Sequence, residues 1–210
     1  MTFSALPLRH PALMLGLFAL IALGLVVTLH EWTREGIAAN EQAELFSEMA
    51  ALLPADSFDN ALLTDVTAVV DARLGTKQPA PVYRLRKAGQ PVAVVISPTA
   101  TDGYNGSISL LVAIKTDGVL AGVRVIRHRE TPGLGDAIET TKSNWIRKMD
   151  GRSLEHPPPA RWQVRRDGGD FDQLAGATIT SRAVIKSVRQ TLEFYRDTSS
   201  RLFDRDDKAQ

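Results

Sequence analysis

The sequence predicts an α+β protein, with a single N-terminal transmembrane helix followed by a domain that has a mainly antiparallel sheet and flanking helices. Three observations predict this fold class. Residues 11–29 form an apolar run without a charged side chain. Residues 82–127 contain alternating apolar and polar side chains and a hairpin signal. From residue 182 onward, apolar side chains recur at the spacing of one helix face.

The composition narrows the possible functions. A hydrophobic content of 44% and a charged content of 23% are typical of a folded protein. The formal net charge of +1 gives no indication of a nucleic-acid partner. The absence of cysteine excludes disulfides, thiolate metal sites, all-cysteine iron–sulfur clusters and a lipoprotein anchor on an N-terminal cysteine. A redox function would therefore need an organic cofactor or a metal site without thiolates, and no motif predicts a metal site.

The apolar run has the length of a membrane-spanning helix. Its nineteen residues, Pro11 to Leu29, at about 1.5 Å each, come close to spanning a hydrocarbon core of about 30 Å. Arg9 precedes the run and no acid does, which favours a cytoplasmic N-terminus. We therefore expect residues 1–10 in the cytoplasm and a transmembrane helix over residues 11–29.

A cleaved signal peptide is the alternative interpretation of this run. Its best cleavage site would lie near Gly36-Ile37-Ala38. Three charged residues separate that site from the apolar run, which is farther than is usual in signal peptides: Glu31, Arg34 and Glu35. We therefore expect an uncleaved anchor with the bulk of the chain outside the cytoplasm, which is the periplasm if the source is a Gram-negative bacterium.

The helical pattern continues beyond the apolar run. Apolar residues share one face up to Leu52, and Pro54 is expected to end the helix. The sequence thus predicts a helical stalk over residues 30–54. A folded domain is expected over residues 55–200, with a charged, flexible tail over residues 201–210.

Alternating residues predict the sheet. Val82–Arg86 alternates, Val92–Ile96 is a continuous apolar run typical of a buried strand, and Ser107–Lys115 alternates again. Asp117-Gly118 is a strong hairpin signal, and Val119–Arg127 would be the returning strand. The residues from Thr101 to Gly106 are expected to form a loop. Three or four antiparallel strands are therefore predicted, with a further strand near Trp162 and Val164.

Two glycine-rich segments adjoin these strands. Gly103-Tyr104-Asn105-Gly106 opens the third strand and, alone, predicts only a turn. His128-x-Glu130-Thr131-Pro132-Gly133-Leu134-Gly135 follows the last strand and precedes a helix expected from about Asp136 to Met149. A zinc deaminase is excluded because no Pro-Cys-x-x-Cys is present. A dinucleotide fingerprint is excluded because the third glycine and the βαβ context are missing. Gly133 and Gly135 would let the backbone approach a flat ring closely.

A third segment leads into the C-terminal helix. It is Asp172-Gln173-Leu174-Ala175-Gly176-Ala177-Thr178-Ile179-Thr180-Ser181, with Thr180 and Ser181 as predicted N-cap residues. A helix N-terminus carries unpaired N–H groups and suits a phosphate, which the Thr178 hydroxyl could meet. The alternative is a plain turn and a capped helix, with Thr178 as a polar turn residue.

The third segment resembles a flavinylation motif. Asp172-x-x-Ala175-Gly176-Ala177-Thr178 is similar to Asp-x-x-(Ser/Thr)-Gly-Ala-Thr, and Ala175 is the one departure. In that family a flavin transferase, with FAD as donor, esterifies the last threonine to the phosphate of FMN. The resemblance implies one covalent FMN on Thr178, with Asp172, Gly176 and Ala177 as parts of the site.

The three segments together, in this order and behind a single anchor, resemble the G subunit of the Rnf (Rsx) electron transport complex. The resemblance implies an electron-transfer subunit with covalent FMN, in the bacterial inner membrane, in a complex that passes electrons between ferredoxin and NAD and moves ions. It implies other membrane subunits and a flavin transferase as partners, and no independent catalytic activity or catalytic residue. Thr131, Pro132, Gly133, Leu134 and Gly135 are expected against the flavin ring.

Several assignments stay open at this stage. Tyr104 and Trp145 are each either ring neighbours or ordinary core residues, and Glu130 is either a polar contact or a solvated acid. The protein could instead be the equivalent FMN subunit of another complex, such as the C subunit of the sodium-translocating NADH:quinone reductase, or a cofactor-free assembly module on the membrane. A basic region could meet an acidic partner, membrane lipid or only solvent; it contains Lys142, Arg147, Lys148, Arg152, Arg161, Arg165 and Arg166.

Overall fold

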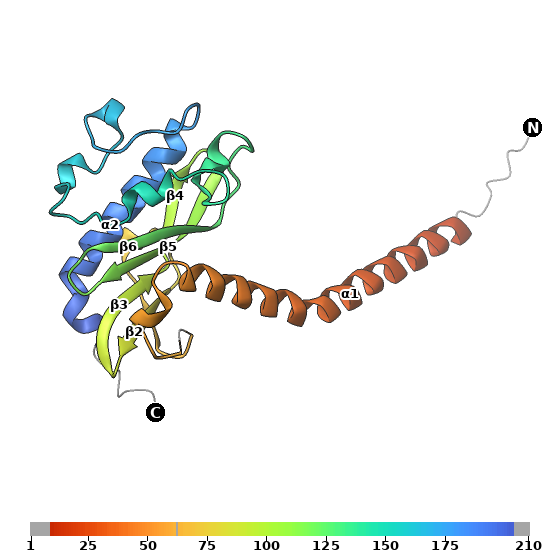
Figure 1. Ribbon diagram of the computed structural model, residues 1–210. Coiled ribbons are helices and arrows are strands. Elements are labelled where there is room, and N and C mark those ends of the chain that lie inside the picture. The colour runs from red at the N-terminus through yellow and green to blue at the C-terminus, as the bar shows by residue number, and fades with distance from the viewer. Residues whose placement is uncertain (1–8, 62, 204–210) are drawn as a thin grey trace, which may run out of the picture. The chain divides into compact units, whose positions relative to one another are not determined.

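The computed structural model describes residues 9–61 and 63–203. The chain divides into two compact units, Met1–Glu44 and Leu45–Gln210. Helix α1 (Arg9–Ala50) begins in the first unit, and its last residues belong to the second (Figure 1).

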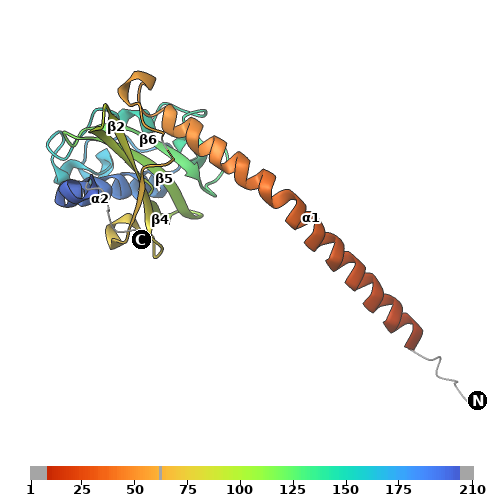
Figure 2. The same cartoon turned by 90° about the horizontal axis from the view of Figure 1, so that it is seen from below.

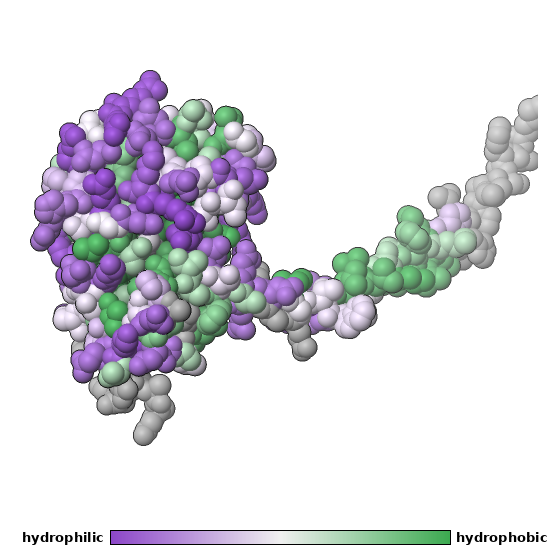
Figure 3. Space-filling view, in the orientation of Figure 1, coloured by the Kyte–Doolittle hydropathy of each residue, from purple (hydrophilic) through white to green (hydrophobic). Residues whose placement is uncertain are grey.

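The first unit consists, in its described part, of α1. Within it, the segment Pro11–Arg34 is long and apolar enough to cross a membrane, and its side chains are exposed all round. Figure 3 shows a mainly hydrophobic surface along this helix. The hydroxyls of Thr28 and Thr33 donate to the carbonyls of Gly24 and Leu29, so both are satisfied inside the helix. These features fit a membrane anchor.

The second unit is built on a six-stranded antiparallel sheet, which confirms the predicted fold class. The sheet order is β1-β2-β3-β5-β4, and β6 pairs with β5. The strands are β1 (Val66–Val69), β2 (Ala80–Lys87), β3 (Gln90–Ile96), β4 (Thr99–Gly103), β5 (Gly106–Lys115) and β6 (Leu120–Arg127).

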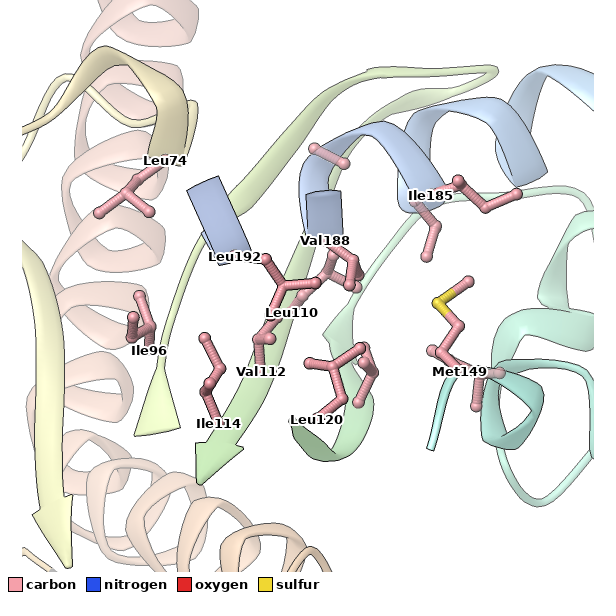
Figure 4. Close-up of a cluster of buried hydrophobic side chains, with 14 of the residues drawn as sticks. Leu74, Ile96, Leu110, Val112, Ile114, Leu120, Met149, Ile185, Val188 and Leu192 are labelled. Carbon is pink, nitrogen blue, oxygen red and sulfur yellow. The ribbon is translucent and has the colours of Figure 1, made fainter. Parts of the chain in front are cut away.

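Helix α2 (Thr178–Leu202) lies along one face of this sheet (Figures 1 and 2). The alternation in β5 divides its side chains between two cores. Leu110, Val112 and Ile114 point toward Val188 and Leu192 of α2 (Figure 4), in the larger cluster. Leu111 and Ala113 join the cluster on the opposite face, which contains the following apolar residues from the end of α1 and the turn after it: Met49, Leu52 and Leu53. The sheet is thus covered on both faces, as its apolar strands require.

Helix α1 ends earlier than predicted. The expected end at Pro54 was wrong, because α1 stops at Ala50 and residues 51–53 turn so that Leu52 and Leu53 enter the core. Arg124 of β6 donates from Nη2 to the Ala51 carbonyl at 3.0 Å and thereby satisfies one of the carbonyls that a helix end leaves free.

Three other local predictions were also wrong. The loop expected at Thr101–Gly106 is mostly strand, because β4 and β5 form a hairpin that turns only at Tyr104 and Asn105. The helix expected over Asp136–Met149 is two short 3₁₀ helices, η3 (Gly135–Ile138) and η4 (Ile146–Met149). Between them the Ser143 hydroxyl donates to the Ala137 carbonyl and accepts from the Trp145 N–H, so it replaces helical bonds. The strand expected near Trp162 is a single bridge from Val164 to Phe171.

Candidate functional site

A cavity of about 560 Å³ lies where four separate segments of the second unit meet. The segments are the β4–β5 turn, the loop after β6, the short 3₁₀ helix η6 (Arg165–Asp167) and the N-terminus of α2. The lining residues are Tyr104, Glu130, Thr131, Leu134, Gly135, Arg166, Gly176, Ala177, Thr178, Ile179 and Thr180. The fold therefore brings together the three segments that were singled out in the sequence.

Most of the residues predicted for the site line this cavity. Pro132, Gly133 and Asp172 do not. Conversely, sequence reasoning missed Arg166, Ile179 and Thr180 as lining residues. Ile179 and Thr180 follow Thr178 directly, so their position in the first helical turn was the signal available for them. Arg166 lies in a basic stretch without a motif, and only the fold places it here.

Helix α2 begins at Thr178, which is earlier than predicted. The assignment of Thr180 and Ser181 as N-caps was wrong: the N-cap is Ala177, and no side chain caps this terminus. The Ser181 hydroxyl instead donates to the Ala177 carbonyl at 3.0 Å and accepts from the Leu174 N–H at 3.0 Å. The first N–H groups of the helix, which lack intrahelical acceptors, are therefore carried by residues that line the cavity.

The Thr178 hydroxyl is available for chemistry. Thr178 is half-buried on the cavity wall, and its hydroxyl has no hydrogen-bond partner among residues 9–61 and 63–203. The partial positive charge of the helix N-terminus favours an anionic group beside this hydroxyl.

Glu130 connects three of the four segments around the cavity. The residue is only 4% exposed, so its carboxyl is a buried contact and not a solvated acid. Oε2 accepts a hydrogen bond from the Thr180 hydroxyl at 2.5 Å, and Oε1 accepts one from the Asn105 N–H at 3.2 Å. One carboxyl from the loop after β6 thus holds both the β4–β5 turn and the first turn of α2.

Glycines leave the room that this carboxyl needs. A Cβ at Gly135 would lie 2.8 Å from the Glu130 Cβ and 2.9 Å from Oε2, and a Cβ at Gly103 would lie 2.9 Å from Oε1. At Gly135 the missing side chain thus makes room for Glu130, and the expected close approach of a flat ring stays a prediction. Gly176 has a φ of +74° and needs glycine for its left-handed conformation.

His128 fixes the start of the loop that carries Glu130. Its Nδ1 accepts from the Glu130 N–H at 3.0 Å, so the ring proton belongs on Nε2, which donates to Glu139 Oε1 at 2.7 Å. No group of three or more potential metal ligands occurs in the part of the chain that the structure describes.

Asp172 lies beside the cavity and organises the turn before α2. Its carboxylate accepts from Lys148 Nζ at 2.9 Å and pairs with Arg165 Nη1 at 3.0 Å. The hydrogen bond from Lys148, with the charges of both cations, lowers the pKa of Asp172. Its carbonyl accepts from the indole N–H of Trp145 at 2.6 Å. Trp145 is 6% exposed and so belongs to the core.

Exposed apolar side chains border the cavity. Tyr104 is 64% exposed, Ile179 48% and Leu134 46%, whereas most large apolar residues of the second unit are buried. Tyr104 is therefore not a core residue. Apolar side chains that converge on a cavity with a few polar groups are typical of a site for a flat organic ligand.

Comparisons with known proteins agree with this geometry. Residues 103–193 match the model of the FMN-binding domain, and residues 1–51 match the model of the RnfG N-terminal region. The G subunit of the ion-translocating oxidoreductase complex of Vibrio atlanticus is 43% identical over 93% of each chain. The protein of the same name from Pseudomonas aeruginosa (strain UCBPP-PA14) is 45% identical over 91% of this chain and 90% of its own. FMN is thus the cofactor, and the chain belongs to the family of G subunits of ion-translocating oxidoreductase complexes.

Proposed function

We propose that this chain holds one FMN covalently through the Thr178 hydroxyl and relays electrons between other subunits of an ion-translocating oxidoreductase complex. The observation that carries the proposal is the free hydroxyl of Thr178 at an uncapped helix N-terminus on the wall of the cavity. Membership of the G-subunit family supports the complex as the place of action.

The residues around the cavity suit the phosphate and the ring of FMN. The uncapped N–H groups at the start of α2 suit a phosphate, and Tyr104, Leu134 and Ile179 offer apolar contact to a ring. When bound, FMN supplies reversible electron transfer, and the protein supplies binding, orientation and electrostatics. Glu130 keeps the loop, the turn and the helix terminus in register around the ligand.

Attachment is a phosphoryl transfer to Thr178. A flavin transferase supplies FAD, the Thr178 oxygen forms a bond to the phosphorus that carries riboflavin, the diphosphate bond breaks, AMP leaves and the hydroxyl proton is released. Asp172 does not line the cavity, and its ion pairs with Lys148 and Arg165 support a function in shaping the turn that presents Thr178. Ala175 is exposed and leaves the turn intact.

The apolar part of α1 supports a membrane arrangement. We propose that residues 1–10 are cytoplasmic, that residues 11–29 cross the inner membrane and that α1 continues beyond them up to Ala50. The second unit would then lie in the periplasm. The expected bounds of its domain, 55–200, and of the tail, 201–210, were wrong, because Leu52, Leu53 and Leu202 are buried in the unit and α2 continues to Leu202. A covalent phosphoester would keep the flavin on the protein in a compartment where free FMN is scarce.

Flavin fluorescence tests the proposal. The full chain, co-expressed with a flavin transferase, is denatured, separated by electrophoresis and examined for fluorescence that stays with the polypeptide. Wild type should fluoresce, Thr178→Val should not, and Thr141→Val, an exposed threonine outside the cavity, should match wild type. A dark wild-type band, with the transferase active on a control substrate, contradicts covalent attachment. Co-purification of further membrane subunits with the wild-type chain tests the complex.

A further inference from the structure

Among the described residues that line the cavity, Arg166 alone has a cationic side chain. It lies in the short 3₁₀ helix η6 (Arg165–Asp167), far in sequence from the β4–β5 turn and the loop after β6. The other charged residue in the lining is Glu130, whose carboxyl already accepts from Thr180 and Asn105. The cavity lining therefore contains a buried acid that is already hydrogen-bonded, Glu130, and an exposed cation, Arg166.

The charged residues on either side of Arg166 form ion pairs with other residues. Arg165 pairs with Asp172, and Asp167 accepts two hydrogen bonds from Arg182, one from Nε at 2.6 Å and one from Nη2 at 2.7 Å. These bonds from Arg182, chiefly, lower the pKa of Asp167. The Arg166 side chain forms no hydrogen bond or ion pair with the described residues. Its guanidinium thus keeps all its donors for a ligand.

The position of Arg166 is fixed relative to Thr178. Arg182 belongs to α2, so its bidentate pair with Asp167 ties η6 to the same helix whose first residue is Thr178. The Arg165 N–H also donates to the Phe171 carbonyl at 2.7 Å, which closes the segment between η6 and the turn before α2. A guanidinium and a helix N-terminus that line the same cavity both favour an anion there.

We infer that Arg166 binds the phosphate of the flavin and makes the site select phosphorylated flavins over riboflavin. The inference rests on the proposed attachment of FMN at Thr178, because that attachment places a phosphate at the start of α2. Arginine suits this function since its planar fork can donate two hydrogen bonds to two phosphate oxygens.

The test compares FMN with riboflavin on the same protein. The full chain is produced without a flavin transferase, kept in detergent and titrated with each compound, with quenching of flavin fluorescence as the signal. Wild type should bind FMN more tightly than riboflavin. Arg166→Ala should weaken FMN binding by about tenfold, as expected for the loss of a charge-assisted hydrogen bond. It should leave riboflavin binding unchanged. Arg166→Lys should retain part of the preference, and added salt should reduce it because the site is exposed.

Arg161→Ala is the matched control, since Arg161 is an exposed arginine of the same basic region that pairs with Asp170 and does not line the cavity. It should keep the wild-type preference. Equal weakening of FMN and riboflavin by Arg166→Ala would indicate a structural function and overturn the inference. An unchanged FMN affinity, or a wild type without preference for FMN, would also overturn it.

A second measurement separates this inference from the attachment itself. With transferase and FAD present, Arg166→Ala should acquire flavin on Thr178 more slowly than wild type and Arg161→Ala. Equal rates for all three chains would count against Arg166 while leaving the attachment intact. A wild-type chain that never acquires flavin would instead refute the attachment.

Discussion

Replacing Thr180 with valine removes the hydroxyl that donates to Glu130 and keeps nearly the same side-chain volume. Thr180 is 1% exposed and Glu130 4%, so the substitution leaves a buried carboxyl oxygen without its hydroxyl donor. A hydrogen bond to a charged group contributes about 1.5–3 kcal/mol to stability. For a domain of this size each kcal/mol shifts the midpoint of thermal unfolding by about 2–4 °C. Thr180→Val should therefore lower the midpoint by roughly 3–12 °C.

The assay is thermal unfolding of the full chain in detergent, followed by near-UV circular dichroism of the buried tryptophans. Thr180→Ser keeps the donor and loses one methyl group, so it should be destabilised by only about 1 kcal/mol. In a Glu130→Gln background, Thr180→Val should cost less than in wild type, because the charged acceptor is gone. If Thr180→Val unfolds at the same temperature as wild type, Glu130 does not hold the start of α2 in the way described.

Two further predictions concern the same unit. Gly135→Ala should destabilise the domain by about 1–3 kcal/mol, because the added Cβ would collide with Glu130. Thermal unfolding that matches wild type would contradict this close packing of Gly135 and Glu130. Burial alone would raise the pKa of Asp65, but hydrogen bonds and charges from two arginines of β2 outweigh burial and lower it below the ordinary 3.8. Its stabilising contribution is therefore present above that value and lost as the pH falls through the lowered pKa. Asp65→Asn should make unfolding less dependent on pH below about pH 4, and a slope as steep as wild type would contradict this.

The sequence predicted the elements whose pattern is strong and regular. The uncharged run in α1, the alternation in β5 and the Asp117-Gly118 turn each have a local cause, so the anchor and the antiparallel sheet could be predicted. The three motif segments also converge on one cavity, as their resemblance implied. Thr178 lies at the helix start, as a phosphate-binding residue requires.

The parts that could not be predicted depend on contacts between distant residues. Arg166 reaches the cavity because Arg182 holds Asp167, and neither residue type nor spacing indicates that pair. Thr180 was interpreted as a cap because its local position suits one, whereas a carboxyl fifty residues away accepts its hydroxyl hydrogen. The helix expected over 136–149 failed because the Ser143 hydroxyl competes for backbone groups, which periodicity does not reveal.

Peptide mass spectrometry of the full chain, produced with a flavin transferase and FAD, tests the central claim most directly. Digestion releases the peptide that contains Thr178, and fragmentation assigns any added mass to one residue. We expect a gain of one FMN less one water on Thr178 and none on Thr180 or Ser181. Unmodified Thr178 under conditions that flavinylate a control substrate, or flavin on another residue, would contradict it.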